Sequence, residues 1–203
     1  MPLFVNQLKG NDPMEIYIVR HGTTQWNLEG RIQGCTDTDL LDSGKEEARL
    51  LEPTVSSLPI KKIYSSPLKR AYDTALILNQ GLNLPLIIKK DLREIEFGEW
   101  EGLTWSQVLD KYSHLIKEND TGYVDPPAGE SFYQALDRVR GVMEEIISAG
   151  ENCLVVSHKA TIRFILYGLI KKTPAQTGAI EIDNLSILKL SFNDKKFVGW
   201  SFT

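Results

Sequence analysis

The chain has 203 residues, of which 42% are hydrophobic and 25% are charged. This composition predicts one ordinary globular domain, and it excludes fibrous and intrinsically disordered proteins. There are 23 Lys and Arg residues against 27 Asp and Glu residues, and the formal net charge of -4 argues against nucleic-acid partners. A local basic pocket for a small anion stays open.

The cysteines and the apolar runs restrict where the protein acts. Cys35 and Cys153 are too few for a disulfide framework and match no metal-ligand spacing, so we expect free thiols in a reducing compartment, by default the cytoplasm. The run 164–170 is far shorter than the ~20 residues that span a bilayer, which excludes a membrane partner. Residues 1–13 lack the pattern of a secretory signal and are interpreted as a leader or a cloning remnant.

Residues 14–203 form one predicted domain, without a repeat or a linker. Its order of elements predicts an α/β fold. Short β-rich runs are separated by segments with helical periodicity, and a final pair of runs predicts a hairpin at a sheet edge. These features favour a three-layer α/β/α sandwich with a mostly parallel central sheet of five or six strands. The runs are 16–19, 63–64, 86–88, 153–156, 186–192 and 196–202.

Helix boundaries are predicted from capping residues. Ser43 and Glu46 form a capping-box pattern, and Ser66 with the proline after it predicts the start of the next helix. Ser131 opens a long amphipathic helix that Gly150 ends. The polar stretch 103–130 interrupts the alternation of strands and helices and is a candidate lid.

Two of the three histidines follow strands. His21 comes directly after the run 16–19, and His158 comes shortly after the run 153–156. Parallel sheets bind ligands outside the carboxyl ends of their strands, so the two imidazoles together indicate a functional site. His114 lies in the polar stretch and is interpreted as an exposed loop residue.

Arginines near these histidines favour a phosphate site over a metal site. A metal would need a third or fourth ligand, and no cluster with ligand spacing is present. Arg20 precedes His21, and Arg70 follows the second strand, where guanidinium groups can grip phosphate oxygens. For Arg163, a surface salt bridge is the favoured interpretation.

The electrostatics of such a pocket would activate a nucleophile. Neighbouring positive charge lowers the pKa of His21 and keeps its imidazole neutral. Helix N-termini at residues 23–24 and after His158 would add backbone N–H donors where phosphoryl charge develops.

Five ordered motifs resemble the histidine phosphatase superfamily, also called phosphoglycerate mutase-like. The resemblance covers the chain from about Met14 to the C-terminus, and the Glu94 motif resembles that of the small broad-specificity and α-ribazole phosphate phosphatases. The motifs are Arg20-His21-Gly22-Thr23 with Asn27 and Arg31-Ile32-Gln33-Gly34; Ser65-Ser66-Pro67-Leu68-Lys69-Arg70-Ala71; Leu92-Arg93-Glu94-Ile95-Glu96-Phe97-Gly98-Glu99-Trp100-Glu101-Gly102; Pro127-Ala128-Gly129-Glu130-Ser131; and Val156-Ser157-His158.

The resemblance implies a role for each of these residues. His21 would attack phosphorus to form a phosphohistidine, Arg20, Arg70 and His158 would bind the phosphoryl oxygens, and Glu94 would act as acid and then as base. Further positions that resemble phosphate- or substrate-binding ones are Asn27, Gln33 and Gly34.

Some acidic residues and one departure from the family pattern have other interpretations. Glu130 is predicted to be structural, and Glu96, Glu99 and Glu101 are interpreted as solvated acids around a turn. Lys159 stands where the family commonly has Gly, and its ammonium could contact a second anionic group of the substrate or crowd the pocket. Aromatic residues that could line the pocket mouth or belong to the core are Trp26, Trp100, Trp105 and Tyr123.

The sequence therefore predicts a metal-independent phosphomonoesterase that acts on small phosphorylated metabolites and has no cofactor. A cofactor-dependent phosphoglycerate mutase is the alternative, although the family's mutases usually carry longer insertions and a C-terminal tail. A catalytically weak member that binds phosphorylated ligands is a third interpretation. A thiol phosphatase is disfavoured because no phosphate-cradling loop follows Cys35 or Cys153. A homodimer through the edge of the terminal hairpin is left open.

Overall fold

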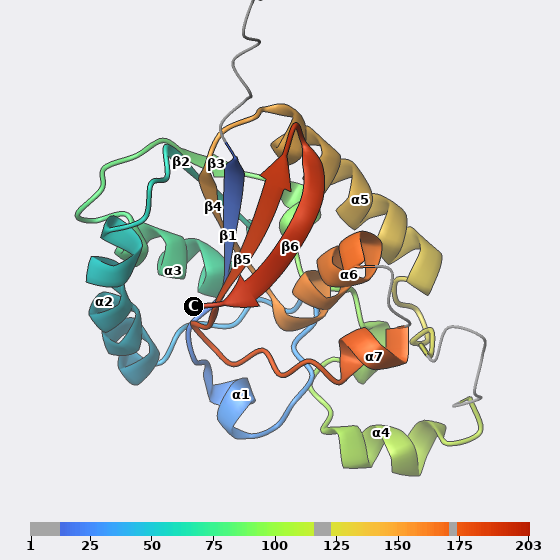
Figure 1. Ribbon diagram of the computed structural model, residues 1–203. Helices are drawn as coiled ribbons and strands as arrows, with labels where there is room; N and C mark the ends of the chain where they lie inside the picture. The colour runs from blue at the N-terminus through green and yellow to red at the C-terminus, as the bar shows by residue number, and fades with distance from the viewer. Residues whose placement is uncertain (1–12, 116–122, 171–173) are drawn as a thin grey trace, which may run out of the picture.

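The fold is built on one six-stranded sheet with the strand order β3-β2-β4-β1-β5-β6 (Figure 1). The computed structural model describes residues 13–115, 123–170 and 174–203, so the predicted leader lies almost wholly outside the described residues. β1 to β4 pair in parallel, whereas β5 and β6 are antiparallel. The predicted mostly parallel sheet and the edge hairpin are confirmed. The strands are β1 (Met14–Arg20), β2 (Lys62–Ser65), β3 (Leu86–Ile88), β4 (Cys153–Ser157), β5 (Ile187–Asn193) and β6 (Lys196–Phe202).

Helices cover both faces of this sheet. Figure 1 shows α2 and α3 on one side and α5 and α6 on the other, whereas α1, α4 and α7 lie beyond the lower end of the strands. No helix among the described residues is long and apolar enough to cross a membrane. The helices are α1 (Gln25–Leu28), α2 (Asp42–Ser56), α3 (Lys69–Leu78), α4 (Trp105–Tyr112), α5 (Phe132–Ser148), α6 (Lys159–Ile170) and α7 (Pro174–Gly178), with 3-10 turns at Lys90–Leu92 and Gly98–Trp100.

The side chains of β1 alternate between two cores. Ile16 and Ile18 pack in the cluster that includes buried residues of α5 and α6. Tyr17 and Val19 belong to the cluster on the opposite face, with residues of α3. All four side chains are buried, as expected for a strand that is covered on both faces. The three-layer arrangement is therefore confirmed.

Helix starts agree with the sequence prediction only in part. Ser131 caps α5 with a capping box, and Gly150 adopts a φ of +69° just beyond the helix, as predicted. The prediction for Ser43 is wrong, because α2 begins one residue earlier and Leu41 occupies the N-cap without a side-chain hydrogen bond. Leu41 is held by its backbone N–H, which donates to the carbonyl of Thr23 at 3.0 Å, and this contact sets the start of the helix.

The start of α3 differs from its prediction for a similar reason. Leu68 is the N-cap and makes no side-chain cap bond. Ser66, which lies two residues before this N-cap, instead accepts a hydrogen bond on Oγ from the Leu68 N–H at 3.2 Å, so it shapes the approach of the chain to the helix. This position places its hydroxyl at the edge of the sheet.

Strand register brings the two predicted motifs together. Arg20 at the end of β1 is the partner of Ser157 at the end of β4, and the His21 N–H continues the ladder by donating to the Ser157 carbonyl at 3.0 Å. His21 and His158 therefore leave neighbouring strands at the same edge. His21 and Ser157 are 136 positions apart in the sequence, and they share one site because β1 and β4 pair in this register.

The predicted lid contains one helix and its own small core. Val108 and Tyr112 of α4 are buried against Trp100, apart from the two main clusters. Trp100 is only 1% exposed, so it belongs to a core and not to a pocket mouth. Residues 116–122 of this stretch lie outside the described residues, and its action as a lid stays a prediction.

Candidate active site

His21 is buried in a single tautomeric arrangement. Its Nδ1 lies 2.8 Å from the backbone oxygen of Gly22, and because a carbonyl can only accept, Nδ1 carries the proton and donates it. Nε2 of the neutral ring then keeps its lone pair. Burial lowers the pKa of His21 well below its usual range, and the positive charges of Arg70 and Arg20 lower it further. The predicted neutral imidazole is thus consistent with the surroundings of the ring.

His158 lies beside this imidazole. The two ring centroids are 5.1 Å apart, and the Nε2 atom of His158 lies 2.7 Å from the Oγ atom of Ser66. Its Nδ1 atom is buried and has no hydrogen-bond partner among the described residues. Burial lowers the pKa of His158 well below its usual range, followed in effect by the charge of Arg70. A second neutral ring therefore stands next to the first.

The two predicted arginines are held through their outer nitrogens. Arg20 donates from Nη1 to the carbonyl of Ile182 at 2.8 Å. Arg70, which is fully buried, donates from Nη1 to the carbonyl of Thr36 at 2.9 Å and from Nη2 to that of Gly34 at 2.7 Å. The Nε atoms of both side chains are buried without a partner in the part of the chain that the structure describes. Each guanidinium is fixed in place and still has a donor for an anion.

Glu94 is fixed by the first turn of α6. Its Oε1 accepts hydrogen bonds from the backbone N–H of Thr161 at 3.0 Å and from that of Ile95 at 3.0 Å. Its Oε2 accepts one from the backbone N–H of Ala160 at 3.2 Å. The N–H groups of Ala160 and Thr161 were expected to face the phosphoryl group, and that expectation is wrong for these two donors because the carboxylate uses them. The N-terminus of α6 therefore positions the side chain of Glu94.

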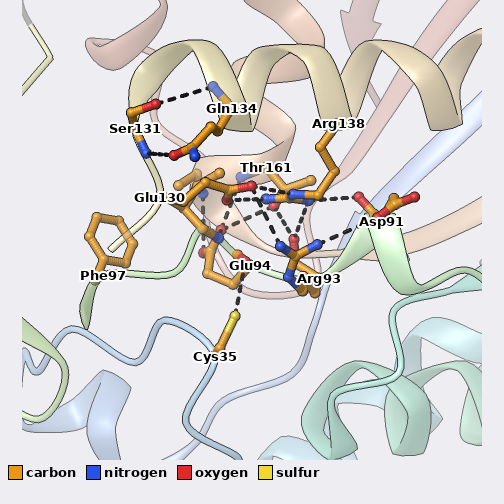
Figure 2. Close-up of polar contacts among 12 residues, drawn as sticks. Cys35, Asp91, Arg93, Glu94, Phe97, Glu130, Ser131, Gln134, Arg138 and Thr161 are labelled. Atoms are coloured by element: carbon orange, nitrogen blue, oxygen red, sulfur yellow. Dashed lines mark hydrogen bonds and ion pairs between the residues drawn. The ribbon is translucent and has the colours of Figure 1, made fainter. Parts of the chain in front are cut away.

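A buried ion pair supports the chain next to this carboxylate (Figure 2). Arg138 of α5 donates from Nε and Nη2 to the two oxygens of Glu130, at 2.6 Å each. Its Nη1 donates to the carbonyls of Asp91 at 2.7 Å and Arg93 at 3.1 Å. The carbonyl of Arg93 also accepts from the Thr161 hydroxyl at 2.7 Å. Glu130 is structural, as predicted, and it reaches the residue before Glu94 through Arg138.

The segment after α1 is ordered by side-chain oxygens. Gln33 accepts on Oε1 from the hydroxyls of Thr24 at 3.1 Å and Thr38 at 2.7 Å. Asn27 accepts on Oδ1 from the Thr24 N–H at 3.1 Å, which uses the donor expected there for phosphate. Both amides therefore shape the wall of the site through this segment.

Glu101 performs a task that its interpretation as a solvated acid misses. Its carboxylate accepts hydrogen bonds from the backbone N–H groups of Cys35 at 2.9 Å, Thr36 at 2.9 Å and Phe97 at 3.0 Å. Gly34 has a φ of +55°, and a Cβ there would lie 2.0 Å from Oε1 of Glu101. The carboxylate therefore packs directly on the glycine whose carbonyl holds Arg70.

A cavity of about 190 Å³ unites almost all the predicted site residues. His158 is the exception, since it is fully buried and not part of the lining. The interpretation of Arg163 as a surface salt bridge is wrong: this residue lines the cavity, donates to the carbonyl of Ile180 at 3.1 Å and has a buried, unpartnered Nε among the described residues. The lining comprises Arg20, His21, Asn27, Arg31, Ile32, Gln33, Gly34, Arg70, Glu94, Phe97, Lys159, Ala160 and Arg163.

Lys159 adds a positive charge to one wall of the cavity. Its Nζ lies 3.8 Å from Oε2 of the exposed Glu181. Burial lowers the pKa of Lys159, and the charges of Arg163 and Arg20 lower it further. With these arginines the ammonium gives the site an excess of positive charge. Among the described residues, no group of three or more His, Cys, Asp or Glu side chains is arranged to hold a metal ion.

Comparison with known proteins agrees with this constellation. Residues 16–202 match the model of the histidine phosphatase superfamily, branch 1. Phosphoserine phosphatase 1 of Hydrogenobacter thermophilus is 32% identical over 189 residues, which cover 91% of this chain and 90% of that protein. A 2,3-bisphosphoglycerate-dependent phosphoglycerate mutase of Gloeobacter violaceus is 34% identical over 177 residues, or 83% of this chain and 81% of that protein.

A solved structure extends the likeness to three dimensions. The α-ribazole phosphatase of Shigella flexneri superposes with a TM-score of 0.81 at 25% identity, and the alignment covers 91% of this chain and 94% of that one. The strand-end histidines, the positively charged cavity and the family match thus agree with one another. The chain belongs to branch 1 of the histidine phosphatase superfamily and has the phosphoglycerate mutase-like fold.

Proposed function

We propose that the chain is a metal-independent phosphomonoesterase in which His21 is the nucleophile. The observation that carries the proposal is the state of its ring: Nδ1 donates to the Gly22 carbonyl, and burial with two neighbouring guanidinium groups keeps the imidazole neutral. Nε2 attacks phosphorus while the bond between phosphorus and the ester oxygen breaks. The product of this step is a phosphohistidine and an alcohol.

Glu94 handles the proton in both half-reactions. Its protonated carboxyl gives the proton to the departing ester oxygen, and the resulting carboxylate takes a proton from the water that attacks the phosphohistidine. The bond between phosphorus and Nε2 then breaks, and inorganic phosphate leaves. The hydrogen bonds from Ala160 and Thr161 hold the Glu94 side chain at the wall of the cavity.

Arg20, Arg70 and His158 stabilise the transferring phosphoryl group. The Nε donors of the two arginines, which have no partner in the described part of the chain, supply positive hydrogen-bonding groups for its oxygens. The Ser66 hydroxyl accepts from the Leu68 N–H and lies 2.7 Å from Nε2 of His158, so it can give its own proton to that nitrogen. The ring proton of His158 then resides on Nδ1, where it is a further donor to the phosphoryl group.

Phosphate release from a panel of small phosphomonoesters, with EDTA present, tests this proposal. We expect turnover by the native chain and none by His21→Ala, with a matched control in His114→Ala, whose imidazole lies on the exposed part of the lid stretch. An alkaline quench during turnover should trap phosphate on the native chain in a form that is stable in base and is released by later acid treatment. Wild-type-like turnover by His21→Ala would overturn the mechanism.

The mutase named above supports a second candidate, transfer of the phosphoryl group to another phosphoglycerate position. Both reactions share the phosphohistidine and differ in its acceptor. Incubation with phosphoglycerates separates them: a phosphatase releases inorganic phosphate, whereas a mutase interconverts the isomers and releases little.

We also infer a cytoplasmic location and a homodimer as working expectations. The two cysteines are free thiols, and β6 presents the outer edge of the sheet, which a second copy could cover. Cell fractionation and light scattering of the purified chain test the two expectations separately.

A further inference from the structure

A second cavity adjoins the phosphate cavity, which is the one that His21 lines. It has a volume of about 380 Å³ and shares with the phosphate cavity the lining residues Ile32, Phe97, Ala160 and Arg163. The four common residues place the two spaces side by side. The alcohol part of a phosphomonoester bound at His21 would therefore face this larger space.

The larger cavity is aromatic. Six of its lining residues carry aromatic rings, contributed by the turn at Phe97, by α4, by the segment before α5, and by α5 and α6. Phe132 and Phe164 are core residues whose rings are 5.2 Å apart, so this wall is rigid. The rings are those of Phe97, Trp105, Tyr123, Phe132, Phe164 and Tyr167.

The charged lining of this cavity is one guanidinium, as far as the structure describes it. Arg163 is the only Asp, Glu, Lys or Arg residue in the described lining. Among the described residues of the phosphate cavity, the only carboxylate is that of Glu94, which already accepts hydrogen bonds from α6. An ammonium group on the alcohol would thus meet positive charge and, within the described lining, no free carboxylate, which disfavours amino-acid phosphates.

We propose, resting on the phosphomonoesterase function above, that the preferred substrates are phosphomonoesters of aromatic alcohols without a cationic group. The planar ring of such an alcohol packs among the aromatic side chains, and burial of its apolar surface strengthens binding. Arg163 lines both cavities and offers its Nε, which has no partner among the described residues, to an oxygen next to the ring. Small zwitterionic phosphomonoesters such as phosphoserine are poorer substrates, in contrast to the phosphoserine phosphatases among the relatives.

The test compares leaving groups of similar intrinsic reactivity. We expect kcat/KM for 2-phenylethyl phosphate to exceed that for ethyl phosphate and for phosphoserine by about tenfold or more, since the phenyl ring adds buried apolar area. All three are alkyl phosphates, so a better aryl leaving group cannot produce the difference. Equal values, or a higher value for phosphoserine, would overturn the proposal.

Two variants locate the preference. Trp105→Ala removes a ring from the cavity wall on the surface helix α4, and the ratio of kcat/KM for 2-phenylethyl phosphate over ethyl phosphate should fall several-fold. Tyr133→Ala removes another aromatic side chain, which is 68% exposed and outside the cavity, and it should leave the ratio unchanged. An unchanged ratio in Trp105→Ala and in a second cavity variant, Tyr167→Ala, would contradict the assignment.

A binding experiment separates this proposal from the catalytic one. Titration of His21→Ala with 2-phenylethyl phosphonate and with ethyl phosphonate measures the cavity preference without any turnover. Tighter binding of the aromatic phosphonate supports the proposal even if the native chain hydrolyses nothing. Equal binding overturns the proposal even if the native chain is an active phosphatase.

Discussion

Glu130 and Arg138 form two parallel hydrogen bonds of 2.6 Å, and neither side chain lines the phosphate cavity. Arg138 nevertheless bonds the carbonyl of Arg93, the residue before Glu94. Thr161 bonds the same carbonyl and Glu94 itself (Figure 2). The ion pair therefore positions the acid from outside the cavity.

Replacement of Glu130 tests this positioning role. Glu130→Gln leaves Arg138 with a buried and uncompensated charge, so we expect the free energy of unfolding to fall by about 3 kcal/mol. Because the Arg93 carbonyl loses its fixed donor, kcat should fall several-fold while KM changes little. Urea denaturation and steady-state kinetics measure the two effects. Glu144→Gln, on the exposed side of α5, is the matched control and should change neither.

Replacement of Glu94 tests the acid itself. Glu94→Gln keeps the shape of the side chain and removes the transferable proton, so hydrolysis of ethyl phosphate should slow by about 10²- to 10⁴-fold. Hydrolysis of 4-nitrophenyl phosphate should slow much less, because nitrophenolate departs without protonation. The comparison uses kcat/KM, which covers only the steps up to the phosphohistidine, and equal slowing of kcat/KM for both esters would assign another role to Glu94.

Stability should depend on pH through the two buried imidazoles. The pKa values of His21 and His158 lie well below their usual range in the folded chain, so the unfolded chain binds more protons as the pH falls. The free energy of unfolding should therefore decrease as the pH falls below about 6.5, the ordinary pKa of histidine, and it should be insensitive to these groups above that pH.

Urea midpoints at about pH 7.5 and about pH 5.5 measure this dependence. His21→Ala should show a smaller loss between the two values than the native chain. The exposed His114 provides the control, since His114→Ala should lose as much as the native chain. A native-like loss in His21→Ala would contradict a neutral buried His21.

Gly34 and Gly30 provide a matched pair of glycines. Both adopt a positive φ, but only at Gly34 would a Cβ meet another group, the carboxylate of Glu101. Gly30→Ala should cost about 1 kcal/mol of backbone strain. Gly34→Ala should cost about 2 kcal/mol or more, and it should weaken inhibition by inorganic phosphate, because the Gly34 carbonyl holds Arg70. If both substitutions lower the free energy of unfolding equally and phosphate inhibition is unchanged, the Gly34 carbonyl does not hold Arg70 in the position that binds phosphate.

The parts of the site that follow strands could be predicted from the sequence. His21 and His158 could be predicted because parallel strands end at one edge of a sheet, and Arg20 could be predicted because it adjoins His21. Arg163 and Glu101 were missed because their roles depend on chain segments far away in the sequence. A carboxylate in a motif resembles a solvated acid until the backbone N–H groups of Cys35 and Thr36 are seen to converge on it.

Helix starts illustrate the same limit on a smaller scale. Ser131 caps α5 as its local pattern predicts, whereas the equally good pattern at Ser43 fails because a tertiary contact of Leu41 sets the boundary. Local capping preferences are worth about 1 kcal/mol, and a fixed tertiary contact can outweigh them.

Because β1 pairs with β4, the residues of the reaction and the residues that select the substrate lie on different parts of the fold. The two histidines and Arg20 follow or end the central strands β1 and β4, which are paired up to Arg20 and Ser157. Local unfolding of this part of the site would require breaking the middle of the sheet. Part of the aromatic half, Phe97, Trp105 and Tyr123, comes from the turn, the helix α4 and the segment outside the sheet and its covering helices. Changes in those segments can therefore diversify substrates while the residues of the reaction stay fixed at the centre of the sheet.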